Sequence, residues 1–275
     1  MRGARREPRP YRDWTKPRAT QPPPGHGMIV ASVGLGLPGD FITIGLARFF
    51  QSSFTLRHAL WHDMALSEKI AVIQPGPAAA PPGPPAAGRD WGDGFAAFNS
   101  GPAVILDARH PPAAQLAWLT QENPAYLMTS AANVLQLAAQ ILAGTPSPPG
   151  LRAIHTETGP HTAAARLACR AAFAVPLIAT LMAPETGFLA LQCPDHPHLH
   201  GLSECAKLEI LNERNQPSAA GETGRLIVTP LHNFVMPLLR FDTGLSVRLG
   251  GACSCGRSLP VLADIQDRAT TPPAA

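Results

Sequence analysis

Charged residues are scarce in this sequence, and no apolar stretch is long enough to cross a membrane. Of the 275 residues, 15% are charged and 45% are hydrophobic, so the chain is too apolar to be intrinsically disordered. The longest apolar stretch, residues 171–184, is interrupted by Pro176 and falls short of the roughly 18 residues of a membrane span. Residues 1–14 lack the apolar segment of a signal peptide. We therefore expect a folded cytoplasmic protein that does not insert into a membrane.

Cysteine is also infrequent, which argues against a secreted disulfide framework. The chain has five cysteines, an odd number, and two of them form the close pair Cys253 and Cys255. Such a set is more typical of metal ligands or free thiols in a reducing compartment.

Positive charge is concentrated at one end of the chain. The net charge is +3, and seven of the 22 basic residues lie within the first 18 positions. We interpret this stretch as a solvated basic end and expect no nucleic-acid partner.

Proline and glycine divide the chain into segments. Residues 75–88 consist almost wholly of proline, alanine and glycine, which is typical of a linker or surface loop. The predicted organisation is a disordered, basic, Pro-rich lead-in (1–27), an apolar segment with a glycine-bearing loop (28–74), a linker (75–94), an α/β part (95–187), a β region (188–268) and a tail (269–275).

Hydrophobic periodicity predicts an α/β fold with an appended antiparallel β region. Apolar runs and helical stripes alternate along the first part, and period-two alternation begins after Gly187. The predicted helices are 41–50, 112–121, 129–142 and 162–173. The predicted strands are 103–106, 151–155, 175–180, 207–210, 225–229, 235–241 and 246–249.

Six short motifs in a fixed order carry a resemblance to a known family. They are Ala183–Gly187, Cys193-Pro194 with His198–His200, Gly221–Thr229, Asn233–Gly244, Cys253–Arg257 and Ile265–Arg268. In this order they resemble the phenylacetate–CoA ligase family of AMP-binding, adenylate-forming enzymes, which includes capsule-biosynthesis-like members. The resemblance implies a shortened large domain of the adenylate-forming fold. It also implies that a small carboxylic acid reacts with MgATP to an acyl-adenylate and passes to coenzyme A.

The resemblance assigns candidate residues to the nucleotide side of the site. Glu185 stands where the family has its magnesium-binding, catalytic glutamate. Ser32 and Gly36 match parts of the phosphate loop, and Arg240 and Arg268 match nucleotide-side arginines. Leu245 departs from the pattern, because the family has a ribose-binding aspartate there.

The resemblance also implies a structural zinc site. Cys193, His200, Cys253 and Cys255 stand where family members carry zinc ligands, and three thiolates with one imidazole form a closed tetrahedral set. His198 is the competing imidazole, and a group of buried free thiols is the alternative reading.

Two functions therefore remain open. One is an adenylate-forming acid–CoA ligase, with ATP, magnesium and coenzyme A as cofactors if it is active. The other is a non-catalytic, zinc-stabilised binding or regulatory module that kept the fold and lost the chemistry. No lysine follows Lys207, so we expect the family's small C-terminal lid domain to be absent, with a partner chain as its possible source.

Overall fold

The computed structural model describes residues 29–33, 38–42, 45–76, 82–92, 95, 98–157, 162–183 and 185–268. The helices are α1 (Gly45–Trp61), α2 (Pro112–Glu122), α3 (Ala131–Leu142) and α4 (Thr162–Phe173). The strands before α4 are β1 (Ile29–Val33), β2 (Pro38–Ile42), β3 (Ile70–Gln74), β4 (Ala86–Gly88), β5 (Ala103–Asp107), β6 (Tyr126–Thr129) and β7 (Ala153–Glu157). The later strands are β8 (Leu177–Ala183), β9 (Gly187–Gln192), β10 (Leu199–Gly201), β11 (Ala206–Leu211), β12 (Thr223–Pro230), β13 (Phe241–Leu249) and β14 (Val261–Asp267).

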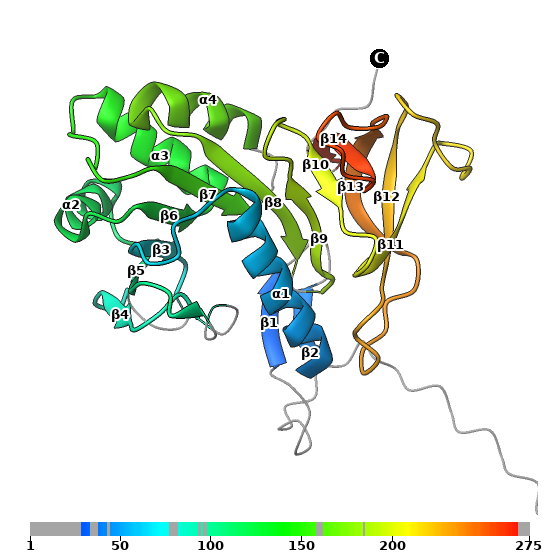
Figure 1. The fold of residues 1–275 in the computed structure, drawn as a ribbon, viewed down its shortest axis with the longest axis horizontal. Coiled ribbons are helices and arrows are strands. Elements are labelled where there is room, and N and C mark those ends of the chain that lie inside the picture. The colour runs from blue at the N-terminus through cyan, green and yellow to red at the C-terminus, as the bar shows by residue number, and fades with distance from the viewer. Residues whose placement is uncertain are drawn as a thin grey trace, which may run out of the picture.

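One large mixed sheet runs through the molecule (Figure 1). Its 12 strands follow the order β11-β12-β13-β14-β10-β9-β8-β7-β6-β3-β5-β4. The strands from β5 to β8 in this order are parallel, and β9 to β14 pair antiparallel. β1 and β2 form a separate two-stranded sheet.

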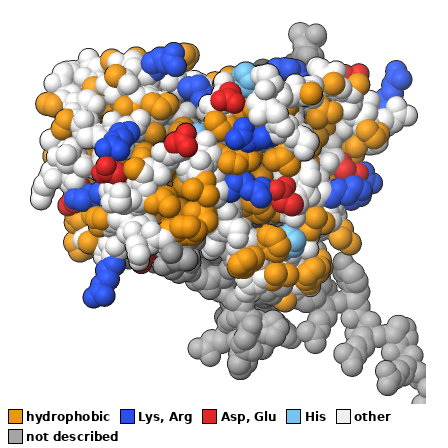
Figure 2. Space-filling view, viewed as in Figure 1, with side chains coloured by type: hydrophobic (Ala, Val, Ile, Leu, Met, Phe, Trp, Pro, Cys, Tyr) orange, Lys and Arg blue, Asp and Glu red, His pale blue; other side chains and the backbone are white. Residues whose placement is uncertain are grey.

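Helices cover the two faces of the parallel part differently. α2, α3 and α4 pack on one face, where Leu116, Leu137 and Ile154 belong to a fully buried core. α1 packs on the opposite face, where Ala59, Ile70 and Phe95 form a smaller core. Figure 2 shows hydrophobic side chains over the middle of the viewed face, where α1 lies. The large hydrophobic side chains that α1 exposes are Leu46, Phe49 and Leu60.

The sequence signals explain most of the regular elements. The apolar run of β5 is a strand, as predicted, and Val104 and Leu106 pack in the core under the helices, whereas Ile105 is 37% exposed, so the strand is not buried throughout. The side chain of Ser130 accepts a hydrogen bond from the backbone N–H of Asn133 (3.2 Å) and caps α3. The predicted helix 162–173 is confirmed as α4. Among the described helices, none combines the length and hydrophobicity needed to span a bilayer.

One predicted helix and one predicted strand differ from the structure. The helix predicted over 41–50 spans Gly45–Trp61, because Phe41 and Ile42 belong to β2. The strand predicted over 235–241 is wrong for 235–240, which form bends and loop; Arg240 there has a left-handed φ of 49°.

The predicted linker 75–94 includes β4, which pairs with β5 at the sheet edge. The boundary predicted between residues 187 and 188 falls inside β9, which is hydrogen-bonded to β8. The large sheet therefore joins the α/β part to the β region.

Candidate functional site

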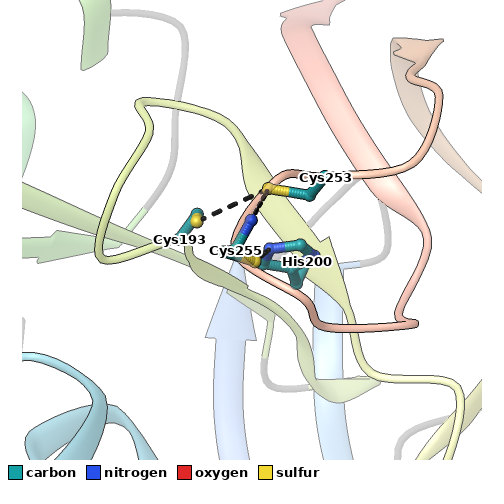
Figure 3. A group of neighbouring side chains, drawn as sticks. All are labelled: Cys193, His200, Cys253 and Cys255. Atoms are coloured by element: carbon teal, nitrogen blue, oxygen red, sulfur yellow. Dashed lines mark hydrogen bonds between the residues drawn. The ribbon is translucent and has the colours of Figure 1, made fainter.

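The structure brings together the four residues predicted to bind zinc. One ligand atom from each of Cys193, His200, Cys253 and Cys255 lies within 4.8 Å of the others. Figure 3 shows these side chains pointing toward one another from three segments of the chain. The Sγ atoms of Cys193 and Cys253 are 3.9 Å apart, and the Sγ of Cys255 is 3.3 Å from Nε2 of His200. A tetrahedral zinc ion with Zn–S bonds of about 2.3 Å holds two sulfurs about 3.8 Å apart, so the arrangement fits zinc.

Strand pairing positions the first two ligands. Cys193 follows β9 directly, and its backbone N–H donates to the carbonyl of His198 (2.9 Å). β10 then returns antiparallel to β9, which places His200 opposite Leu191. Both Cys193 and His200 are fully buried.

The other two ligands lie in the loop that precedes β14. The Gly250 N–H donates to the Val261 carbonyl (2.8 Å) and closes the base of this loop. Gly256 has a φ of 77°, which a glycine adopts without strain, so the chain turns directly after Cys255. Since β14 pairs with β10, the loop lies beside His200.

The thiols of this group differ in acidity. Burial raises the pKa of Cys193 to about 11. Burial acts in the same direction on Cys255, but hydrogen bonds from the backbone and side chain of Arg257 outweigh it and lower its pKa to about 6. Cys255 thus becomes a thiolate, the form that binds a metal, more readily than Cys193 does.

The competing imidazole lies outside the group of four. The ring of His198 is 5.3 Å from that of His200, centroid to centroid, and burial lowers its pKa. The geometry therefore selects His200.

A contact to α1 was not expected from the sequence. The rings of Trp61 and His200 meet edge to face with centroids 6.0 Å apart. The guanidinium of Arg257 lies 4.5 Å from the centroid of the Trp61 ring. Trp61 is about 140 to 200 positions from these partners, so no local sequence pattern could reveal that the group of four contacts the end of α1.

Glu185 lies in the turn between β8 and β9. Its side chain is 3% exposed, and neither carboxyl oxygen has a hydrogen-bond partner among the described residues. It lines a cavity of about 40 Å³ together with Phe50, Phe188 and Asn233. A buried carboxyl group without a partner is uncommon, and its free oxygens suit a hydrated cation such as Mg²⁺.

The other predicted nucleotide-side residues do not gather around Glu185. Arg240 is exposed and pairs with Glu209 (3.3 Å between Nε and Oε2). Arg268 pairs with Asp242, which also pairs with Arg225 at 2.9 Å. Burial alone would raise the pKa of Asp242, but hydrogen bonds from Gly244 and Arg268 outweigh it and lower that pKa. Neither predicted arginine lines the Glu185 cavity.

Two remaining positions can be placed only in part. Ser32 lies in β1, opposite Gly39 of β2, and Gly36 falls outside the described residues.

Leu245 is 6% exposed and belongs to the core of the β region, so it offers no acceptor to a ribose.

Comparison with known proteins rests on structure alone, because no protein-family model and no curated protein sequence matches this chain. A 2-hydroxyisobutyryl-CoA ligase in complex with its acyl-AMP aligns with a TM-score of 0.69 at 15% identity, over 88% of this chain and 51% of that one. An anthranilate CoA ligase with anthranoyl-AMP gives 0.59 at 14% identity, over 86% and 46%. A benzoate CoA ligase from Burkholderia xenovorans LB400 gives 0.52 at 13% identity, over 82% and 46%.

These structures cover most of this chain, whereas this chain spans about half of their length. The chain therefore has the α/β fold of the adenylate-forming enzymes, with an antiparallel β region continuing its sheet.

Proposed function

We propose that this chain is an AMP-binding, adenylate-forming carboxylate–CoA ligase-like protein of the phenylacetate–CoA ligase type. The buried, unpartnered carboxyl group of Glu185 carries the proposal, within a fold otherwise seen in acyl- and aryl-CoA ligases. Glu185 would hold magnesium through water, and Arg240 and Arg268 would face the nucleotide after releasing their present carboxylate partners. MgATP would supply the adenylyl group with release of pyrophosphate, and coenzyme A would accept the acyl group with release of AMP.

The exchange of pyrophosphate with ATP in the presence of a carboxylic acid tests this function. We expect weak exchange from the chain alone, because Leu245 cannot accept hydrogen bonds from a ribose and Arg268 is engaged by Asp242. Any exchange should disappear in Glu185→Gln, whereas Glu204→Gln, an exposed carboxylate on another loop, should leave it unchanged.

A second candidate is a non-catalytic, zinc-stabilised binding or regulatory module. The intact group of three cysteines and one histidine favours it, since this part of the family pattern is complete while the ribose position is filled by a core leucine. Complete absence of exchange, with a folded zinc-containing protein, would decide for this module. Robust exchange would exclude it.

Zinc binding itself is measured by elemental analysis of the purified protein. About one zinc per chain is expected, held by Cys193, His200, Cys253 and Cys255. Cys253→Ser should lose the metal. Cys169→Ser is the matched control, because Cys169 is a buried free cysteine on α4, away from this group.

A further inference from the structure

A second cavity, of about 430 Å³, lies between α1 and the sheet face that α2, α3 and α4 leave uncovered. This volume is within the range of small-molecule sites, about 300–1,000 Å³. Gln51 and Phe188 line both this cavity and the Glu185 cavity, so the two are neighbours. Glu157, the last residue of β7, also lines it, and ligands of parallel sheets bind at the carboxyl ends of strands.

The cavity changes from polar to apolar along α1. Gln51 and Ser52 line one end, and Ala59 lines it eight residues later, about 12 Å further along a helix axis. Near that apolar end lie Trp91 and Phe95, whose ring centroids are 5.2 Å apart. The described lining includes no lysine or arginine. A ligand with an apolar, uncharged body therefore fits this end better than a charged one.

Two imidazoles in the cavity wall are linked to each other. Nε2 of His58 on α1 lies 2.8 Å from Nδ1 of His155 on β7. Both side chains are more than nine-tenths buried. Burial lowers the pKa of His155 to about 3 and that of His58 well below its usual value, so both rings are neutral at pH 7.

This pair has unused hydrogen-bonding capacity. Nδ1 of His58 and Nε2 of His155 have no partner among the described residues. Each neutral imidazole has one N–H and one acceptor nitrogen, and the bond between the rings uses one of each. Whichever ring donates, the pair keeps one free N–H and one free acceptor. An unpaired buried polar group destabilises the folded protein, so a ligand that satisfies one of them gains affinity.

We propose that this cavity binds a ring-sized apolar ligand that carries a hydroxyl group, and that His58 and His155 determine this specificity. Both free nitrogens are buried in this structure, so a ring must turn toward the cavity before a ligand hydroxyl, which both donates and accepts, can pair with its nitrogen. The inference deepens the proposed function, in which the ligand is the acid and its carboxyl group lies toward Gln51 and Glu185. Binding in the cavity needs no nucleotide and is measured separately from catalysis.

Calorimetric titration with matched neutral amides tests the inference on the full chain. The probes are 3-phenylpropanamide and its three ring-hydroxylated isomers. An amide replaces the carboxylate of the acid, so that the probe brings no negative charge near Glu157 and Glu185. At least one isomer should bind at least tenfold more tightly than the unsubstituted probe. In His155→Phe this preference should fall below twofold, whereas the exposed change Leu167→Phe on α4 should leave it intact.

If His155→Phe does not fold, His58→Phe is the second variant. We expect it to lose the preference for the hydroxylated probe as well. Nitrogen-15 shifts of the ring nitrogens supply a readout that a merely structural pair would not change. The preferred isomer should move the shifts of His58 or His155, and the unsubstituted probe should not. Equal affinity of all four probes, or a preference unchanged in both histidine variants, overturns the inference. Specific binding of the amide without any exchange activity contradicts the proposed function but leaves this inference standing.

Discussion

Leu245 is the residue whose burial most restricts what the nucleotide side can do. It lies in β13, pairs with Asp267 of β14, and packs in the core with Val247 and Leu262. The family resemblance suggests that an aspartate here would restore a ribose contact. The structure instead places the side chain where a carboxylate would be buried among apolar groups.

Leu245→Asp should therefore destabilise the protein without creating a nucleotide site. We expect the free energy of unfolding to fall by at least about 3 kcal/mol, because the new charge is buried without a partner. Urea denaturation measures this loss, and Leu167→Asp, at an exposed position, should change stability little. Tighter ATP binding by a stable Leu245→Asp protein would contradict this account.

Glu185→Gln should have opposite effects on stability and function. A buried carboxylate without a partner costs more free energy than an amide of the same shape, so the variant should be more stable by about 1–2 kcal/mol. The same change should abolish any magnesium-dependent ATP binding. Thermal unfolding with and without MgATP measures both effects; an unchanged shift on adding MgATP would remove Glu185 from the site.

At the scale of elements, the contact of α1 with β7 makes stability dependent on pH. The pKa values of His58 and His155 are lowered in the folded state, so the unfolded chain binds more protons below its histidine pKa of about 6.5. The stability that these neutral rings provide is present above pH 6.5. It is lost progressively as pH falls toward about 3, the folded pKa of His155.

Urea denaturation at pH 7, 6 and 5 should show this loss. Each histidine should contribute up to about 1.4 kcal/mol per pH unit below pH 6.5. In the double variant His58→Gln and His155→Gln the slope should become clearly shallower, even if the protein is less stable at pH 7. The same slope in both proteins would assign the acid sensitivity to other groups.

Local signals in the sequence predicted which segments form helices and strands better than they predicted which strands pair. The predicted helix 162–173 is confirmed as α4. Its buried residues recur at helical spacing within the segment itself, so the local sequence was enough to predict it. The strand predicted over 235–241 is wrong for 235–240, because Pro237 and the left-handed Arg240 interrupt the apolar pattern before β13 begins at Phe241. Strand order could not be predicted, since pairings such as that of β10 with β14 join residues about 60 positions apart.

The two candidate sites differ in how far the sequence could predict them. The residue types and spacing of Cys253 and Cys255, with the family resemblance, led to the group of four. The second cavity had no such signal, because His58 on α1 belongs to no recognisable motif. His155 comes from β7, and only the packing of α1 on the sheet brings it to His58.

At the scale of the whole molecule, a metal at the group of four would join three parts of the fold. Cys193 and His200 belong to the β9–β10 hairpin, and Cys253 and Cys255 belong to the loop before β14. Trp61 brings the end of α1 against the same group. Because the unfolded chain has no preformed site, metal binding contributes directly to the stability of these joined parts.

A chelator should therefore loosen a defined region rather than the whole protein equally. We expect a lower melting temperature, together with faster hydrogen exchange in β10, the 250–260 loop and the last turn of α1, while α3 keeps its protection. The reason is that α3 packs in a separate core on the other face of the sheet. Cys253→Ser should show the same pattern without chelator, and Cys169→Ser should not. Exchange that is unchanged by chelator at the 250–260 loop would mean that contacts such as the hydrogen bond between His196 and Ser254 (2.8 Å), and not a metal, hold the loop in place.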